Sequence, residues 1–199
     1  IPLISVDREL EHAHADFVGT DDERIGEMAA EELIRLGHTR LGQIAGPDAV
    51  TTGRRRRRGF ERAVEKAGLS CRTIISPKFD EGLEVIPDLL ASPDRPTAVF
   101  AANDVLASQT YQVALQMNLH IPGDLSVIGC SNLSISRLLS PELSTFEHFP
   151  GKIGTEAAKL LLDRLDKKHN DSDLPVVPRR TLIMPEYIAR GSTAAPHRT

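Results

Sequence analysis

Polar side chains directly after short apolar runs are the residues of this chain that could bind a ligand. They are Asp7 after run 3–6, Asn103 and Asp104 after run 98–102, and Ser131 and Asn132 after run 125–130. In an open parallel sheet a ligand binds in the crevice outside the carboxyl ends of the strands, where such residues gather. An amide such as Asn103 can bind a ligand or cap a helix, and both roles stay open for it.

An arginine is the second candidate, within the unbroken run 54–58. On a helix, successive side chains lie about 100° apart, so the run cannot form one nucleic-acid-binding face. Arg56 is predicted to point toward a ligand, because its planar fork suits vicinal hydroxyls, carboxylates or phosphates. Thr52 lies one helical turn earlier, and a surface position for the arginine is the alternative. Phe79, in a loop, could stack on a sugar or base or pack in the core.

Catalytic and metal-binding patterns are missing from the sequence. It has no nucleophile elbow, no phosphate-binding P-loop and no glycine-rich dinucleotide turn. Cys71 and Cys130 match no metal or redox spacing. We expect the pair His12 and His14 to be solvated and not to bind a metal. We therefore expect no catalytic residue, no metal and no cofactor, with a nucleotide-binding α/β enzyme as a remote alternative.

Composition narrows the class of protein further. The 199 residues are 40% hydrophobic with a net charge of −4, which indicates a globular protein without general attraction to nucleic acid. No apolar stretch approaches the roughly 18–20 residues of a membrane span, and no signal peptide is visible. Two free thiols suit a reducing cytoplasm. Because the chain opens in a strand-like run without Met, we expect a fragment or a processed product.

Alternating strands and helices must position these candidates. Unbroken apolar runs predict strands buried on both faces of a parallel sheet, and three- and four-residue apolar spacing predicts helices. The expected strands are 3–6, 17–20, 41–45, 73–75, 98–101, 125–128, 144–147 and about 180–185. The expected helices are 24–36, 54–66, 83–90, 104–117 and 151–167, followed by a polar linker at 169–174. This βαβ pattern indicates an α/β fold.

Several of these segments together resemble the effector-binding core of the LacI/GalR family of bacterial transcriptional regulators. The matching segments are 21–23, 36–47, 56–60, 95–104, 121–129, 139–145 and 189–193. They follow one another in register over nearly the whole chain. The resemblance implies a periplasmic-binding-protein-like fold of two doubly wound parallel-sheet subdomains, the proximal one incomplete in this chain.

The resemblance also implies a domain division and an upstream region. Residues 1–20 and 130–146 are expected in the proximal, DNA-side subdomain. The distal, effector-binding subdomain is expected to contain 21–129 and 147–190, with 191–199 as a tail. The family's DNA-binding helix-turn-helix and the first part of its proximal subdomain are expected upstream of this sequence.

Effector-contacting residues are implied position by position. By resemblance, Arg56 and Thr52 supply a guanidinium and a hydroxyl, Asn103 an amide, Asp7 a carboxylate at the cleft and Phe79 a covering ring. Ser131 stands where the family usually has an aspartate. Loss of that carboxylate favours an anionic or phosphorylated effector over a neutral sugar.

The predicted function is therefore effector sensing and dimerisation in a cytoplasmic transcriptional regulator. A sugar, sugar phosphate or purine-like molecule is expected to control operator binding by the absent module, without a membrane partner. A homodimer is expected, with Tyr111, Val113 and Leu115 of helix 104–117 at its interface. The alternative function is a periplasmic or extracellular solute-binding protein of a sugar transporter.

Overall fold

The computed structural model describes residues 1–11, 13–170 and 177–197, and it contains two compact units. Unit 1 consists of Ile1–Asp21 and His148–Pro185, and unit 2 consists of Asp22–Glu147 and Glu186–Thr199. This division differs from the expected one, because 130–146 belong to the larger unit and the helix after 147 belongs to the smaller one. Within the described residues, no helix is long and apolar enough to cross a membrane.

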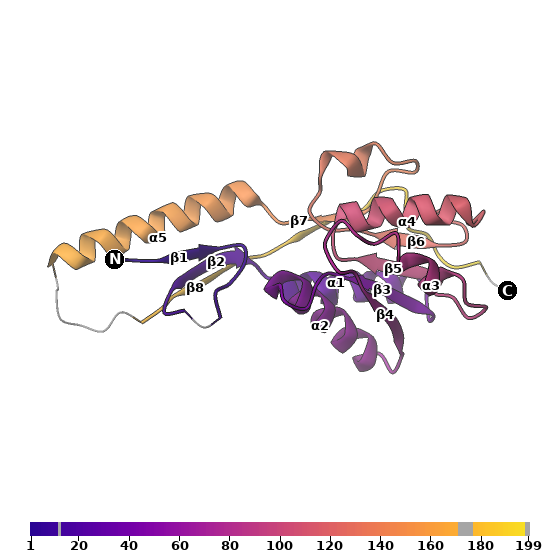
Figure 1. The fold of residues 1–199 in the computed structure, drawn as a ribbon, viewed down its shortest axis with the longest axis horizontal. Coiled ribbons are helices and arrows are strands. Elements are labelled where there is room, and N and C mark those ends of the chain that lie inside the picture. Colours follow the sequence, from indigo (N-terminus) through magenta and orange to yellow (C-terminus); the bar gives the residue numbers. More distant parts are fainter. Residues whose placement is uncertain (12, 171–176, 198–199) are drawn as a thin grey trace. The chain divides into compact units, whose positions relative to one another are not determined.

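Unit 1 is a parallel sheet with one long helix packed on it (Figure 1). Its strands have the order β1-β2-β8, and Val18 at 0% exposure forms the centre of a small core with Ile153 and Leu160. The helix packs on this sheet through its apolar stripe and therefore belongs to unit 1. The elements are β1 (Ile4–Val6), β2 (Asp16–Thr20), α5 (Pro150–Asn170) and β8 (Arg180–Ile183).

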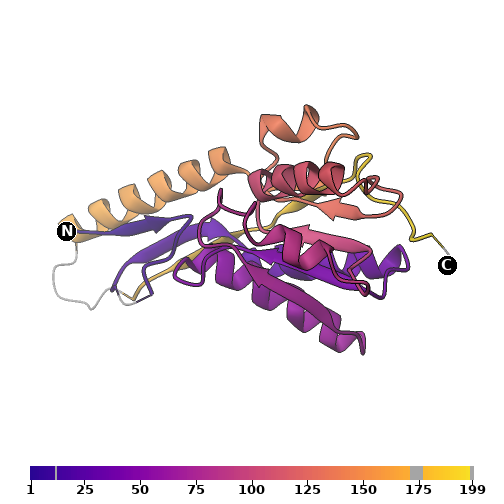
Figure 2. The same cartoon turned by 45° about the vertical axis from the view of Figure 1, so that its right-hand side comes forward.

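Unit 2 is built around a four-stranded parallel sheet of order β4-β3-β5-β6, which confirms the predicted doubly wound α/β fold. Figures 1 and 2 show α1 and α2 on one face of this sheet and α3 and α4 on the other. The strands are β3 (Leu41–Ala45), β4 (Cys71–Ile75), β5 (Ala98–Ala101) and β6 (Ser126–Ile128). The helices are α1 (Asp22–Arg35), α2 (Thr51–Lys66), α3 (Ile86–Leu90) and α4 (Asp104–Gln116).

Alternate side chains of each strand enter two different cores. Ile44, Val99 and Val127 pack under α3 and α4, whereas Phe100 and Ile128 pack under α1 and α2. Burial on both faces explains why these strands are continuously apolar in sequence.

Helices α1 and α2 approach closely through two glycines. A Cβ at Gly26 would lie 2.0 Å from the Arg56 carbonyl oxygen, and a Cβ at Gly59 would lie 2.0 Å from the Glu23 carbonyl oxygen. Any larger residue at either position would push the two helices apart. This close packing places the first turn of α1 beside the middle of α2, where Arg56 lies.

Three helix starts differ from the sequence prediction by two or three residues. Helix α2 begins at Thr51, so Thr52 is helical, and α1 begins at Asp22. Helix α3 begins only at Ile86, with Pro87 in its first turn, where a missing N–H is tolerated. Of the predicted linker, residues 169–170 end α5, and the rest lies outside the described residues.

Near its carboxyl terminus the chain returns to unit 2 and pairs there. An antiparallel pair, β7 (Thr145–Glu147) with β9 (Glu186–Ile188), and the 3-10 helix η1 (Ser134–Arg137) complete the unit. The sequence analysis did not predict β9 or η1.

Residues 191–194 do not form the expected tail. Ser192 is fully buried, donates to the Val127 carbonyl at 2.6 Å and accepts from the Ser144 N–H at 2.8 Å. The Ala194 N–H donates to the Ser126 hydroxyl at 3.1 Å. This segment therefore belongs to the packed body of unit 2.

Candidate functional site

The carboxyl ends of three strands of unit 2 meet at one edge of its sheet. Ile44 pairs with Ala101, and Phe100 pairs with Ile128, so β3, β5 and β6 end at the same level. The segments that follow them begin at Gly46, Ala102 and Gly129. In a parallel sheet this is the edge where ligands bind.

Arg56 joins three elements at this edge. Its side chain is 6% exposed, its Nε donates to Asp22 Oδ1 at 2.8 Å, and its Nη1 donates to the Ala102 carbonyl at 2.7 Å. Thr52, one turn earlier on α2, is 4% exposed. The guanidinium is therefore held beneath the tip of β5 by a buried ion pair with the first turn of α1.

Asn103 performs the capping role that the sequence left open. Its Oδ1 accepts from the Leu106 N–H at 2.8 Å, which caps α4, and its Nδ2 donates to the Phe79 carbonyl at 3.0 Å. Phe79 is half-buried, and a Cβ at Gly46 would lie 2.4 Å from its ring. The amide and the ring thus fix the loop after β4 against the tips of β3 and β5.

Ser131 and Asp7 both have left-handed backbones. Ser131 has φ 113° and donates its N–H to the Phe146 carbonyl at 2.9 Å. Asp7, at the end of β1, has φ 64° and donates its N–H to the Val18 carbonyl at 3.0 Å. Such conformations cost on the order of 1–3 kcal/mol for residues other than glycine and concentrate at functional sites.

The structure brings five of the six predicted residues to one edge. Contacts within unit 2 gather the segments that carry Thr52, Arg56, Phe79, Asn103 and Ser131. Asp7 belongs to unit 1, so its predicted contact with an effector stays a prediction.

Two buried carboxylates lie at the site, and the sequence analysis named only Asp104 as a candidate. Asp22, which the sequence analysis included only within the matching segment 21–23, is 2% exposed and pairs with Arg56. Asp104 is fully buried, and its oxygens accept from the Thr145 hydroxyl at 2.5 Å and from the Leu133 N–H at 2.7 Å. Burial raises the pKa of the Asp104 carboxyl, and these hydrogen bonds oppose that rise.

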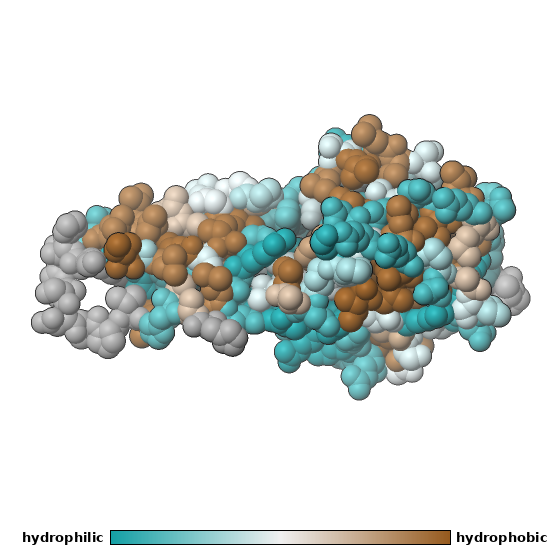
Figure 3. Space-filling view, viewed as in Figure 1, coloured by the Kyte–Doolittle hydropathy of each residue, from teal (hydrophilic) through white to brown (hydrophobic). Residues whose placement is uncertain are grey.

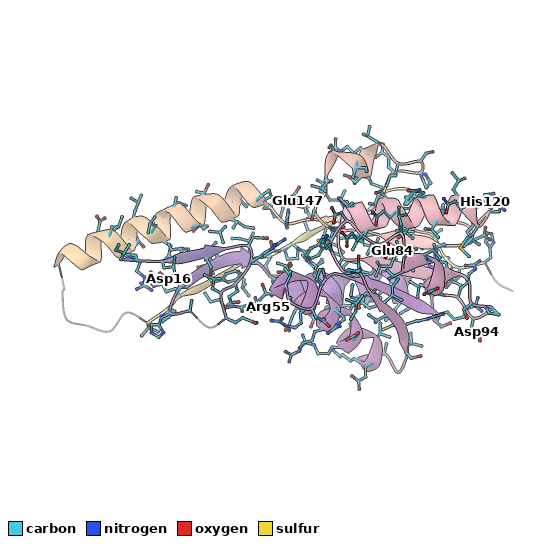
Figure 4. The ribbon with its side chains drawn as sticks, viewed as in Figure 1. Asp16, Arg55, Glu84, Asp94, His120 and Glu147 are labelled. Carbon is cyan, nitrogen blue, oxygen red and sulfur yellow. The ribbon has the colours of Figure 1, made fainter. Side chains whose placement is uncertain are left out.

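A largely buried arginine completes the polar network on the other side of the β6 tip. Arg190 donates from Nη2 to Asn132 Oδ1 at 2.7 Å and from Nη1 to the Ser136 hydroxyl at 2.9 Å. Asn132 in turn donates to Glu147, the last residue of β7, at 2.9 Å (Figure 4). The buried charges at this edge therefore comprise two carboxylates and two guanidinium groups.

The other arginines of the run do not form a basic face. Arg57 pairs with Asp48 at 2.8 Å, and Arg58 lies 3.8 Å from Glu23 at 72% side-chain exposure. Figure 3 shows a strongly hydrophilic surface over α1 and α2. On these helices Arg62 also pairs with Glu23 and Glu27. This arrangement favours a solvated, ion-paired surface over a phosphate-binding one.

Covalent and metal chemistry have little support at this edge. Burial raises the pKa of the Cys130 thiol to about 12, so it stays a neutral core residue. Throughout the described residues, no cluster of three or more His, Cys, Asp or Glu side chains could hold a metal ion. What the edge offers is hydrogen bonding beside an aromatic ring.

Comparisons with known proteins identify the family. A model described as a periplasmic binding protein-like domain matches residues 30–193. An HTH-type transcriptional repressor PurR from Pasteurella multocida is 32% identical over 179 residues, which are 86% of this chain and 52% of that protein. This chain thus spans about half the length of the curated relatives it matches.

Solved structures agree with this match in fold. A LacI family transcriptional regulator from Mycobacterium smegmatis has TM-score 0.86 at 28% identity, covering 98% of this chain and 72% of that one. A LacI family regulator from Enterococcus faecium with bound ribose has TM-score 0.83 at 28% identity, covering 98% and 71%. The chain therefore belongs to the periplasmic binding protein-like domain family and, within it, to the LacI/GalR family of bacterial transcriptional regulators.

Proposed function

We propose that this chain is the effector-binding part of a cytoplasmic transcriptional regulator. A small molecule binds at the carboxyl edge of the unit 2 sheet and changes the operator affinity of a helix-turn-helix module outside the chain. The observation that carries the proposal is the convergence of Arg56, Asn103 and Phe79 at the carboxyl edge of the unit 2 sheet. Relatives named as transcriptional repressors support this function over a transporter's solute-binding protein.

The balance of buried charge favours a neutral effector. Asp22 already neutralises Arg56 at 2.8 Å, and Asp104 is a second buried carboxylate at the same edge. Arg190 faces Glu142 at 3.6 Å and Asn132 at 2.7 Å. An added phosphate would meet no uncompensated positive charge there, and it would lose its hydration on binding.

This charge balance argues against the anionic effector that Ser131 alone had favoured. Hydroxyls, amides and an aromatic face suit a polyhydroxyl molecule such as a sugar, which needs many hydrogen bonds and no counter-charge. The structural relatives with bound ribose or cellobiose support the same class.

Binding of a matched pair of ligands tests the proposal. D-ribose and D-ribose 5-phosphate are titrated into the full chain by calorimetry, with hypoxanthine as a purine probe. We expect the neutral sugar to bind and to raise the melting temperature, because a ligand at 100 times its Kd stabilises by about 2.7 kcal/mol. Tighter binding of the phosphate than of ribose would contradict the charge argument.

A site variant shows where the probe binds. Thr52→Val keeps the shape of a buried side chain at the edge and removes its hydroxyl, so ribose affinity should fall. Thr110→Val removes an equally buried hydroxyl that bonds only the Leu106 carbonyl of its own helix. Equal ribose affinity in the two variants would move the site away from Thr52.

Homodimerisation is the remaining part of the proposal, and the structure corrects its predicted residues. Val113 is 2% exposed and belongs to the core, and the Tyr111 hydroxyl donates to the Pro141 carbonyl at 2.9 Å. Leu115 is 78% exposed, and Leu138, at the end of η1, is 81% exposed. Figure 3 shows apolar atoms gathered over η1, which supports an interface built from α4 and η1.

Sedimentation tests this interface. Leu115→Glu should weaken self-association at least tenfold, because it places a charge on apolar surface that the dimer interface would bury. Leu83→Glu, at a leucine 41% exposed elsewhere in unit 2, is the control and should leave it unchanged. Unchanged sedimentation of Leu115→Glu would exclude this surface.

A further inference from the structure

Asp104 joins its own helix start to two other segments that meet at the candidate site. Its N–H donates to the Cys130 carbonyl at 2.8 Å, directly before Ser131. One carboxylate oxygen accepts from the Leu133 N–H at 2.7 Å, and the other accepts from the Thr145 hydroxyl at 2.5 Å. A single buried residue therefore connects the start of α4, the turn after β6 and strand β7.

The Thr145 hydroxyl continues this connection. It donates to Asp104 and lies 3.4 Å from the N–H of Asn132, which follows Ser131 in the chain. The Ser131 N–H donates to the Phe146 carbonyl, one residue further along β7. Strand β7 is thus bonded to the turn that carries Ser131 by both a side chain and the backbone.

Space around the carboxylate leaves it little freedom. A Cβ at Gly129 would lie 2.4 Å from Asp104 Oδ1, so a glycine at that position makes room for the carboxylate. Both Asp104 and Thr145 are fully buried. A buried carboxylate with two close donors holds one geometry, because any displacement leaves a charge without its hydrogen bonds.

Strand β7 has a particular place in the chain. The first stretch of unit 2 ends at Glu147, and the chain continues at His148 into unit 1. Strand β7 is therefore the last element of unit 2 before the chain crosses to unit 1. Asn103 directly precedes Asp104 in the chain. Its side chain caps α4 and bonds to the loop that carries Phe79.

We propose that Asp104 and Thr145 are a positioning pair that couples Asn103 and Ser131 to β7. The inference rests on the proposed function for the effector, whereas the coupling itself involves only unit 2. A change at the strand tips displaces Asp104, and Thr145 carries that displacement into β7. Neither residue needs to touch the effector, so both act by holding the residues that do.

Two substitutions at Thr145 separate the hydroxyl from the rest of the side chain. Thr145→Val removes the hydroxyl and keeps the branched shape, and Thr145→Ser keeps the hydroxyl and removes a methyl group. Thr110→Val is the matched control, because its hydroxyl is fully buried and bonds only within α4. Similar losses of global stability are expected in the two valine variants.

Amide hydrogen exchange of the full chain is the first measurement. In Thr145→Val, exchange at Ser131 and Leu133 should accelerate about tenfold, although both amides keep their own acceptors. Thr145→Ser should retain the protection of the parent protein, and Thr110→Val should change these two amides less than twofold. Equal exchange at these amides in all three variants would overturn the coupling.

Calorimetric titration with D-ribose is the second measurement. We expect the Kd of Thr145→Val to rise about tenfold, with less than a twofold change in Thr145→Ser and Thr110→Val. Unchanged ribose affinity in Thr145→Val would overturn the positioning role and leave the proposed function standing. If the parent protein does not bind ribose, the proposed effector fails for this probe, and amide exchange alone decides the coupling.

Discussion

Removal of one charge from the buried pair Asp22–Arg56 gives the sharpest test of how the candidate site is held. Asp22→Asn preserves the size of the side chain and one acceptor oxygen, so packing stays almost unchanged. The variant removes only the negative charge beside a guanidinium whose side chain is 6% exposed. Arg56 keeps a neutral hydrogen bond to this position and its 2.7 Å bond to the Ala102 carbonyl.

The size of the effect follows from these contacts. Complete removal of one partner of a buried ion pair costs about 3–5 kcal/mol, because the other charge is left uncompensated. Asparagine restores part of the hydrogen bonding, so we expect a loss of about 2–3 kcal/mol in the free energy of unfolding. That is a large share of the roughly 5–15 kcal/mol that stabilises a typical domain.

Urea denaturation at pH 7 measures this loss. Far-UV circular dichroism is a suitable signal, since the chain has no tryptophan. Asp48→Asn is the control, because it breaks the Arg57 pair at a side chain 52% exposed, where ion pairs contribute about 0–1 kcal/mol. With m near 2 kcal/mol/M, the midpoint should fall by about 1 M urea in Asp22→Asn and by less than half of that in the control.

Two results would refute the reasoning. If Asp22→Asn and Asp48→Asn lose the same stability, the ion pair does not hold the site. The second result concerns ligands: Asp22→Asn removes the negative charge paired with Arg56, so affinity for D-ribose 5-phosphate should rise relative to D-ribose. An unchanged ratio of the two affinities would show that this charge does not select the effector.

Further predictions concern both units. Two hydrogen bonds from Arg164, each 2.8 Å, lower the pKa of Asp16. The pair therefore stabilises unit 1 above the ordinary aspartate pKa of about 3.9, and this stabilisation is lost as pH falls through the lowered value. Arg164→Met should cost about 3 kcal/mol in urea unfolding at pH 7 and clearly less near pH 2. Burial lowers the pKa of His38, which is neutral in the fold, so the free energy of unfolding should decrease as pH falls below about 6.5. His38→Gln should flatten this dependence of unfolding free energy on pH between about pH 5 and 7. Equal slopes in the parent protein and in His38→Gln would contradict this. Gly26→Ala should cost about 1–3 kcal/mol, measured as a lowered melting temperature, whereas Gly151→Ala, with no atom within 4 Å of the new Cβ, should not destabilise.

Local patterns were sufficient for most of the secondary structure. The strands 41–45 and 98–101 were predicted with the bounds that the structure has, because unbroken apolar runs of this length occur on buried parallel strands. The helix after Asn103 was predicted from its apolar spacing and its cap. Helix α2 was predicted three residues late, since Thr51 and Thr52 are usual in turns, yet both are helical and buried in the structure.

The sequence by itself determined the α/β fold, the order of its elements and the strand tips at which ligand-binding residues would be found. These properties depend on short-range patterns of apolar residues and on the chemistry of helix ends, which a single sequence displays. The family resemblance added the effector-contacting roles, which remain predictions.

Only the tertiary structure decided which polar groups are buried together. Asp22 lies 34 residues from Arg56, Asp104 lies 41 residues from Thr145, and His38 lies 156 residues from Ala194. No local pattern marks such partners, because a buried charge is tolerated only where the completed fold supplies its counterpart. The same reason explains the assignment of α5 to unit 1 and the packing of residues 191–194, since burial is a property of the whole assembly of elements.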